Sequence, residues 1–198
     1  MIRLGVIAED MSDVDVIKQI TEKIIPVAEF STRHRIGHGC GKLRRKCHAW
    51  AADLSRGGCT HIVVLHDLDN EDERALRSRL ETELADVHAA NSIVLIPIRE
   101  IEAWLLTDAR AIQAVFRLQR PPRLPGQPES IRDPKRLLEE IVWRTARKRY
   151  VNSVHNVHVA RESSLVALET CRSFRPYPAF LRESASTSPS RRRRSGQR

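Results

Sequence analysis

Short apolar runs alternate with amphipathic stretches along the chain as far as Phe116. Runs of strand length occupy residues 3–8, 25–30, 61–66 and 92–98. Because these runs are apolar at nearly every position, they predict strands that are buried on both faces. The other apolar positions recur at helical spacing and are Val16, Ile17, Ile20 and Ile24; Leu43, Cys47, Trp50 and Leu54; Leu76, Leu80, Leu84 and Val87; and Ile101, Trp104, Leu105, Ile112 and Phe116. Strands that alternate with helices predict an α/β fold with a mainly parallel sheet flanked by helices.

Several positions predict where these helices begin and end. Ser12 stands where a helix N-cap is expected, and Asp13 follows in the first turn, where the helix dipole favours a carboxylate. Residues 38–41 predict a loop because two of the four are glycine. The glycine pair at 57–58 predicts the end of the helix that follows this loop.

The pattern loosens after Phe116. Residues 120–133 are rich in proline and predict a loop, whereas Pro134 is well placed at the first position of a helix. A weaker helical pattern covers residues 160–172. We therefore predict three parts: an α/β core over 1–118, a helical C-terminal extension over 119–182 packed on that core, and a disordered basic tail over 183–198.

Composition limits the class of protein. A length of 198 residues is typical of one domain. The formal net charge is +9, but five arginines lie among the last eight residues, so the rest of the chain is only mildly basic. Four cysteines are too few for a disulfide scaffold, and no apolar run approaches the ~18 residues of a membrane helix. Acidic residues interrupt the first apolar run, which argues against a signal peptide. We expect a cytoplasmic protein that does not associate with membranes.

Acidic residues follow three of the four predicted strands. In an open parallel sheet, the carboxyl ends of the strands meet at one edge, where ligands bind. Many carboxylates at one place repel one another unless a cation is present, and hard oxygen ligands suit Mg²⁺ or Mn²⁺. Ordinary acidic loops at strand ends are the alternative. The acidic positions are Glu9, Asp10 and Asp13 after the first strand, Asp67 and Asp69 after the third, and Glu100 and Glu102 after the fourth.

These motifs resemble the Toprim domain, a Rossmann-like α/β fold. The Toprim pattern is a Glu at the end of the first strand and an Asp-x-Asp after a later strand; here Glu9 in GVIAEDMSD and Asp67/Asp69 in VVLHDLDN match it. The segment REIEAWLL and the later DPK segment are similar to small stand-alone Toprim proteins and to nucleases of the OLD (overcoming lysogenization defect) type. The resemblance covers about residues 3–145.

The resemblance implies a metal-dependent nuclease. It implies that Glu9, Asp67, Asp69 and Lys135 are catalytic, with Lys135 near the scissile phosphate. It also implies two Mg²⁺ or Mn²⁺ ions, which cleave a phosphodiester bond of DNA or RNA. Proteins of this small group are often encoded beside an ABC/OLD-type ATPase in bacterial anti-phage defence loci, which implies an ATPase partner. How the ligands divide between the two ions stays open; the ligands implied are Glu9, Asp13, Asp67, Asp69, Glu100 and Glu102.

A basic stretch predicts a surface for nucleic acid. It lies on the helix that follows the loop at 38–41, on the side opposite the apolar stripe, and a phosphate backbone could follow it. An ordinary solvated helix face is the alternative interpretation. The predicted nucleic-acid-binding residues are Lys42, Arg44, Arg45 and Lys46.

Three other groups of residues invite a functional interpretation. Cys40, Cys47 and His48 suggest zinc, but their spacing is unusual for a zinc site, and Cys47 belongs to an apolar stripe. We therefore predict a buried structural cysteine at position 47. His66 is predicted to pack in the sheet rather than to act as a general base. The tryptophans at 104 and 143 lie on apolar helix faces and are predicted to be core residues.

Two other functions stay open. The first is a non-catalytic Toprim subunit that regulates an ATPase complex or binds nucleic acid. The second is a phosphotransfer domain of the receiver type, in which Asp67 accepts the phosphoryl group. A receiver also needs a Lys after a fifth strand and leaves Glu100 and Glu102 without a role, so it ranks lower.

Overall fold

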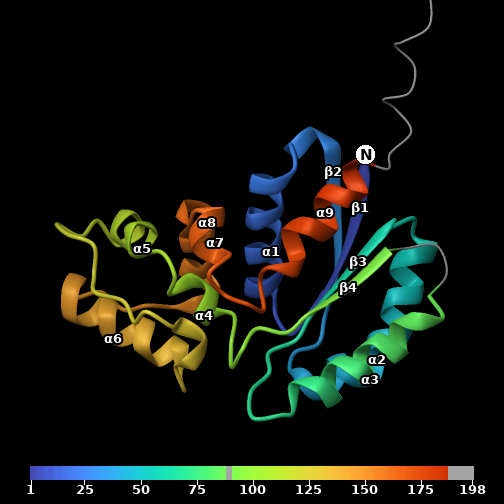
Figure 1. The fold of residues 1–198 in the computed structure, drawn as a ribbon, viewed down its shortest axis with the longest axis horizontal. Coiled ribbons are helices and arrows are strands. Elements are labelled where there is room, and N and C mark those ends of the chain that lie inside the picture. The colour runs from blue at the N-terminus through green and yellow to red at the C-terminus, as the bar shows by residue number, and fades with distance from the viewer. Residues whose placement is uncertain (88–90, 187–198) are drawn as a thin grey trace, which may run out of the picture.

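Four parallel strands form the central sheet of the protein in a computed structural model that describes residues 1–87 and 91–186 (Figure 1). Their order across the sheet is β2-β1-β3-β4, and every neighbouring pair is parallel. The predicted α/β fold with a parallel sheet is therefore confirmed. The strands are β1 (Ile2–Ala8), β2 (Phe30–Ile36), β3 (His61–Leu65) and β4 (Asn91–Leu95).

Helices cover both faces of this sheet. In Figure 1, α2 (Cys40–Arg56) and α3 (Glu73–Ala85) lie on one face, and α1 (Met11–Ile24) lies on the other with α9 (Pro176–Ser186). Successive side chains of a strand point to opposite faces, and β1, β3 and β4 each contribute to two hydrophobic cores. Val63 of β3 belongs to the core under α1, whereas Ile62 and Val64 belong to the core under α2 and α3.

The C-terminal half adds helices at one side of the sheet. Of these, α7 packs on α1 and α5, and α9 contacts both α1 and β4. The hydroxyl groups of Thr21 and Tyr177 lie 2.6 Å apart and join α1 to α9 in the core. The predicted tail lies, from residue 187, outside the described residues. The remaining elements are the 3₁₀ turns Val27–Glu29 and Pro128–Ser130 and the helices α4 (Glu102–Leu105), α5 (Ala109–Phe116), α6 (Pro134–Ala146), α7 (Asn152–Glu162) and α8 (Leu165–Leu168).

The predicted strand at residues 25–30 is wrong. Pro26 is followed by a 3₁₀ turn, and the second strand begins only at Phe30. This strand is mostly polar and half-exposed because β2 is at the edge of the sheet and pairs only with β1. A prediction based on apolar runs therefore selects residues 25–30 and misses the polar strand that begins at Phe30.

Helix ends agree with the prediction in part. Asp10, not the predicted Ser12, is the N-cap of α1: its side chain accepts from the backbone N–H of Asp13, and the Asp13 carboxylate accepts from the backbone N–H of Asp10. This reciprocal capping box begins the helix two residues earlier than a Ser12 cap would. The helix α2 likewise begins at Cys40, inside the predicted loop. The predicted start of α6 at Pro134 is confirmed.

The predicted helix over residues 160–172 is wrong in its bounds. The α7 helix ends at Glu162, and the short α8 begins at Leu165. The break occurs at Ser163, whose extended backbone and buried hydroxyl end the first helix, and Ser164 caps the second by accepting from the Ala167 backbone N–H. Serine in a cap position supplies this hydrogen bond.

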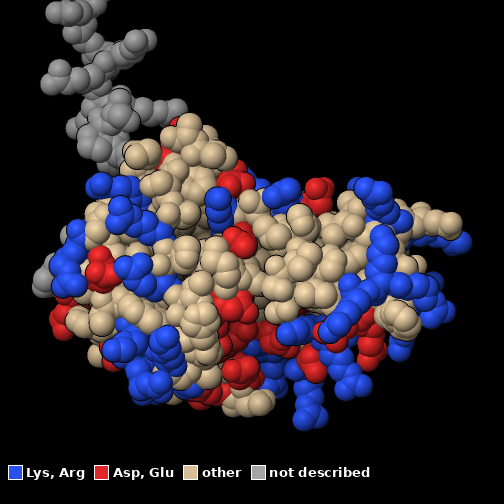
Figure 2. Space-filling view, turned by 180° about the vertical axis from the view of Figure 1, so that it is seen from behind, with Lys and Arg blue, Asp and Glu red and all other residues tan. Residues whose placement is uncertain are grey.

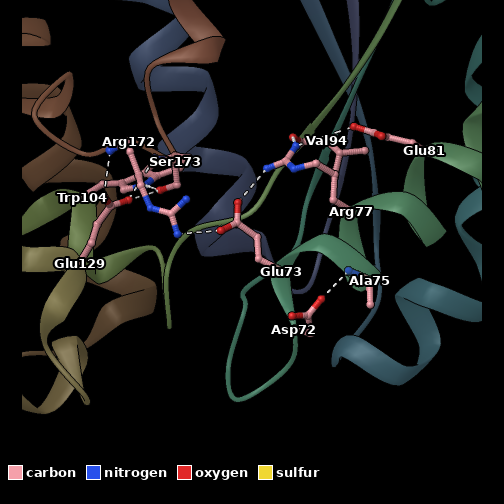
Figure 3. Close-up of polar contacts among 10 residues, drawn as sticks. All are labelled: Asp72, Glu73, Ala75, Arg77, Glu81, Val94, Trp104, Glu129, Arg172 and Ser173. Carbon is pink, nitrogen blue, oxygen red and sulfur yellow. Dashed lines mark hydrogen bonds and ion pairs between the residues drawn. The ribbon is translucent and has the colours of Figure 1, made fainter.

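A polar clasp joins the chain before α9 to the rest of the molecule. The Glu129 carboxylate accepts from the backbone N–H groups of Arg172 (2.8 Å) and Ser173 (3.0 Å) and from the Ser173 hydroxyl (2.5 Å). Figure 3 shows Arg172 also reaching Glu73 of α3, with 2.7 Å between Nη2 and Oε2. These contacts bring α3, the 3₁₀ turn at 128–130 and the segment before α9 together.

Among the residues that the structure describes, no helix has both the length and the apolar character needed to cross a bilayer.

Candidate functional site

The acidic loops after β1, β3 and β4 lie at one edge of the sheet. Glu9 follows directly on β1, and Asp67 comes two residues after the end of β3. Backbone pairing continues beyond the strands: the N–H of Leu68 donates to Pro97 at 3.0 Å, and the N–H of Asp69 donates to Arg99 at 3.1 Å. The loops after β3 and β4 are therefore held side by side. Parallel strands place their carboxyl ends together, as the sequence predicts.

Burial and mutual repulsion raise the pKa of the central carboxyls. Burial raises the pKa of Asp67, and the nearby charges of Asp13 and Glu102 raise it further. The pKa of Asp13 is raised in the same way, first by burial and then by Asp10. Carboxylates influence one another this strongly only when they are close and poorly hydrated. The residues predicted from three separate loops therefore share one electrostatic environment.

Glu9 is held near this group from the β1 side. Burial first, and then the charge of Asp69, raises the pKa of Glu9 to about 6. Asp69 itself is exposed and has a left-handed backbone conformation with φ 51°, unusual for a residue other than glycine. Asp69 therefore lies at the exposed rim of the acidic cluster, whereas Asp13 is buried.

Glu100 and Lys135 approach the cluster from β4 and α6. Burial and the charge of Glu102 raise the pKa of Glu100 to about 7, and the Lys135 ammonium partly offsets these effects. Lys135 lies in the first turn of α6 and is half-exposed. The predicted acidic residues and the predicted lysine are thus brought together, although they lie up to 126 positions apart in the chain.

Asn156 of α7 is part of the site and was not predicted. Its side-chain amide donates to Glu102 Oε1 at 3.0 Å and to Ser12 Oγ at 3.1 Å, and its carbonyl oxygen accepts from the Tyr150 hydroxyl. Glu102 is only 4% exposed, and this amide and the backbone N–H of Glu102 itself hydrogen-bond its buried carboxyl; burial still raises its pKa. Nothing in the sequence separates Asn156 from any other polar helix position.

His66 lies beneath the cluster. It is fully buried, as predicted, and its Nδ1–H donates to the backbone carbonyl of Asp67 at 2.6 Å. Burial lowers its pKa, so the ring is neutral near pH 7. Within the described part of the chain, two buried atoms here have no hydrogen-bond partner: Oε1 of Glu9 and Nε2 of His66. A buried carboxylate oxygen without a donor suits a ligand or a cation.

The residue types at this site fit a divalent cation, but their positions do not form a coordination sphere. In residues 1–87 and 91–186, no three His, Cys, Asp or Glu side chains are close enough together to form a coordination sphere. The donors are nevertheless the carboxylate oxygens that Mg²⁺ and Mn²⁺ prefer, and one of them, Glu9 Oε1, is buried without a partner. The chemistry of these residues therefore fits such an ion.

Acidic and basic side chains are separated on the surface. Figure 2 shows acidic side chains gathered in the lower middle of one face, with basic side chains on both sides. On α2, Lys42, Arg45 and Lys46 are exposed as predicted. Arg44 is less free: its Nη1 lies 2.5 Å from Glu71 Oε1, and its charge acts on Glu9. It therefore belongs to the margin of the acidic cluster.

The residues that suggested zinc are separated in the structure. Cys47 is fully buried under α2, as predicted, and burial raises its pKa to about 12, so the thiol stays protonated. His48 points elsewhere, with Nδ1 2.9 Å from the backbone oxygen of Glu83. Cys40 Sγ accepts from Arg44 at 3.3 Å.

The two predicted core tryptophans differ. Trp104 is fully buried, as predicted, and donates to the Ser173 hydroxyl at 2.8 Å. The prediction for Trp143 is wrong, because this side chain is 56% exposed. Its neighbour Val142 is fully buried, and adjacent residues of a helix point about 100° apart. The apolar stripe of α6 passes through Val142 and leaves Trp143 outside.

Comparison with known proteins gives one match. A family model described as a domain of unknown function, DUF4276, covers residues 8–182. No curated protein and no solved structure matches the chain significantly. The matched residues include the acidic cluster, α6 and the C-terminal helices.

Proposed function

Because the chain belongs to the DUF4276 family, whose description states no activity, we propose its function from its own chemistry: a Mg²⁺- or Mn²⁺-dependent nuclease of the Toprim kind that hydrolyses DNA or RNA. The observation that supports this most directly is the carboxylate cluster at the carboxyl edge of the sheet. Burial, and then mutual repulsion, raises the pKa of Glu9, Asp13, Asp67 and Glu100, and a bound divalent cation would favour their ionised forms.

Each side chain has a role in this proposal. Following the resemblance to Toprim nucleases, Glu9, Asp13 and Asp67 would hold one ion, and Asp69, Glu100 and Glu102 a second. Bound ions of this kind supply an activated water and stabilise the leaving oxygen. Lys135 supports the charge that develops on the phosphoryl oxygens, since its ammonium already acts on Glu100. Asn156 positions Glu102.

The same proposal extends to a partner and a setting. The 198 residues hold no G-x-x-x-x-G-K-[ST] motif for binding a nucleoside triphosphate, and the proposal therefore assigns ATP hydrolysis to a partner. We propose an ABC/OLD-type ATPase as that partner, in an anti-phage defence system.

A nuclease assay tests the activity. We expect the purified protein to cleave at least one of plasmid DNA, single-stranded DNA and tRNA in Mg²⁺ or Mn²⁺. Asp67→Asn and Asp69→Asn keep the size of the side chain but remove its charge, and each is expected to lower the rate ~10²-fold or more. Glu81→Gln, on the exposed side of α3, is the matched control and should cleave like wild type.

Two results contradict this proposal. If both Asp variants cleave at the wild-type rate in both metals, the carboxylates are not the catalytic centre. If the wild-type protein cleaves none of the three substrates, alone or with the ATPase encoded beside it, a non-catalytic subunit is favoured instead.

The exposed bases of α2 give a second prediction. Nucleic-acid affinity is expected to fall steeply with salt because phosphate contacts release counterions. Lys42→Ala and Lys46→Ala should each reduce the slope of log affinity against log salt by about one, whereas Arg79→Ala on α3 should leave it unchanged. Fluorescence anisotropy of a labelled oligonucleotide over a salt series measures the slope. A wild-type affinity that does not depend on salt excludes phosphate recognition by α2.

A further inference from the structure

The C-terminal end of α6 presents an exposed aromatic ring among cations. Trp143 is 56% exposed, and the Arg147 guanidinium lies 6.0 Å from the centre of its ring. Arg147 ends the helix in a left-handed conformation and donates from its backbone to the Trp143 carbonyl at 3.0 Å. Residues 143–149 contain four cations and no acid. A large aromatic side chain left in water beside cations is typical of a binding surface rather than a core.

A cavity of about 290 Å³ opens beside this ring. Lys148 and Arg149 supply positive charge, and the Lys148 ammonium is 3.4 Å from the Phe116 carbonyl. Tyr150, 3% exposed, forms a firm wall because it stacks on His155 with 5.6 Å between the ring centres. The volume is at the lower end of small-ligand sites, enough for one flat ring system but not for a protein segment. The cavity is lined by Glu139, Trp143, Lys148, Arg149 and Tyr150.

The lining distinguishes between possible ligands. Glu139 repels a bare phosphate, but its carboxylate can accept from the amino group of a nucleobase. Trp143 offers a π face, on which any base can stack. Lys148 and Arg149 can then hold the phosphate attached to that base. An aromatic ring, an acceptor and two cations together match an unpaired nucleotide.

The cavity is connected to the acidic cluster. The Tyr150 hydroxyl donates to Asn156, and the Asn156 amide donates to Glu102 at 3.0 Å. A nucleotide in the cavity therefore lies one relay of hydrogen bonds away from the carboxylates. The charges of Glu102 and Glu100 also act on the Tyr150 hydroxyl, so this wall of the cavity lies near the acidic cluster.

We propose that the Trp143 cavity binds an unpaired nucleotide of a single-stranded nucleic acid and so holds the strand beside the acidic cluster. This inference rests on the proposed function for the role of that neighbouring cluster. It adds a substrate preference, because a base within a duplex is stacked and paired and cannot enter the cavity.

Binding in EDTA tests the cavity separately from catalysis. We expect labelled single-stranded oligonucleotides at low ionic strength to bind the wild-type protein. Trp143→Ala is expected to weaken binding about 5- to 150-fold, the range for loss of one base–aromatic stack. Trp143→Phe, which keeps a π face, should restore most of the affinity. Val166→Ala, at a side chain 79% exposed on α8, is the matched control and should bind like wild type.

Parallel arms separate the alternatives. A duplex of the same length should be bound equally by wild type and Trp143→Ala, and DNA and RNA oligonucleotides distinguish the two sources of unpaired bases. Single strands bound by Trp143→Ala as tightly as by wild type would overturn the proposal. So would an equal loss on duplex, which indicates phosphate contacts alone, or a change only in the mass measured by light scattering, which indicates self-association.

The two proposals can fail independently. In EDTA, Asp67→Asn should bind single strands at least as tightly as wild type, because it removes a charge that repels phosphate, and its binding should still depend on Trp143. If Asp67→Asn still cleaves and Trp143→Ala does not bind, the proposed catalytic role of the acidic cluster is wrong and the nucleotide cavity is supported. If Asp67→Asn loses cleavage and Trp143→Ala binds normally, the proposed nucleotide cavity is wrong.

Discussion

At the scale of single residues, Asn156 connects more of the site than any acid does. Its side chain contacts a serine of α1, a buried glutamate after β4 and the tyrosine of the nucleotide cavity. A buried carboxyl needs hydrogen-bond donors to remain ionisable at a moderate cost, and Asn156 is the side-chain donor to Glu102. Because the residue itself is fully buried, it has no access to water that could replace these bonds.

Replacing Asn156 is expected to destabilise the protein. Asn156→Leu keeps the volume but leaves Glu102 and Ser12 without this side-chain donor, and we expect the free energy of unfolding to fall by about 2–3 kcal/mol. Urea unfolding followed by circular dichroism measures this change. Val154→Ala, on the exposed side of the same helix, is the control and should remain within ~0.5 kcal/mol of wild type. Equal stability of the two variants would show that the Asn156 bonds are weak.

The same residue shows what sequence could and could not predict about the site. The acids were predictable because each follows an apolar strand, and the carboxyl ends of parallel strands meet. Asn156 was not, because a lone Asn on a helix 54 positions after Glu102 has no distinguishing pattern. Trp143 was placed in the core because a stripe of period 3.6 is about 100° wide, and the structure decides which neighbours fall outside it.

At the scale of elements, a strand can be recognised in the sequence when its residues are mostly apolar. The inner strands β1 and β3 were predictable because burial on both faces requires mostly apolar residues, and the edge strand β4 was predictable because it ends in the apolar residues Ile93, Val94 and Leu95. The edge strand β2 was not, because its side chains meet water, and Arg33 and Arg35 stand where an inner strand needs Val or Ile. Charged residues on an edge also discourage pairing with another chain.

The acidic edge of the sheet predicts how stability depends on pH. Burial raises the pKa of Glu9 to about 6 and of Glu100 to about 7, above the ~4.3 of an unfolded Glu. Such a carboxyl holds its proton more tightly in the folded state. Its contribution to stability is therefore complete below the unfolded pKa and is lost as the pH rises through the folded pKa of 6 to 7.

Thermal unfolding of the metal-free protein in EDTA checks this dependence. We expect the melting temperature to fall between about pH 5 and pH 8. Glu100→Gln cannot ionise and should reduce that fall, whereas Glu81→Gln should not. A melting temperature that rises over this interval in wild type and in Glu100→Gln alike would contradict the assignment.

At the scale of the whole molecule, the C-terminal helices share one core with the first strand. Ile2 and Leu181 belong to the same hydrophobic cluster, which includes side chains of β1, α1, α5, α6, α7 and α9. The sequence predicted helices packed on the α/β core but not this degree of continuity, because long-range contacts leave no local pattern. The Glu129 clasp adds polar contacts to the same junction (Figure 3).

Loss of the Glu129 contacts is expected to lower the stability of the whole molecule in a single unfolding transition. Glu129→Ala removes the acceptor for the backbone N–H groups of Arg172 and Ser173, and we expect a loss of about 1–3 kcal/mol in the free energy of unfolding. Denaturation followed by tryptophan fluorescence and by circular dichroism should give coincident transitions. Glu81→Ala, which removes an exposed acid of α3, serves as the control. Two separate transitions in the wild-type protein would show that the helices unfold independently.

The hydrogen bond between Thr21 and Tyr177 also affects when the chain can fold during synthesis. The two residues are 156 positions apart, and translation at ~5–20 residues per second needs roughly 8–30 s to cover that distance. Until the chain has been made as far as α7, the α1 face that meets α7 has no partner, and the part that meets α9 waits longer, until Tyr177 has left the ribosome. The nascent chain must therefore keep an apolar helix in solution for many times longer than the helix needs to form. For this protein, protection during synthesis is as much a condition of folding as the stability of the finished core.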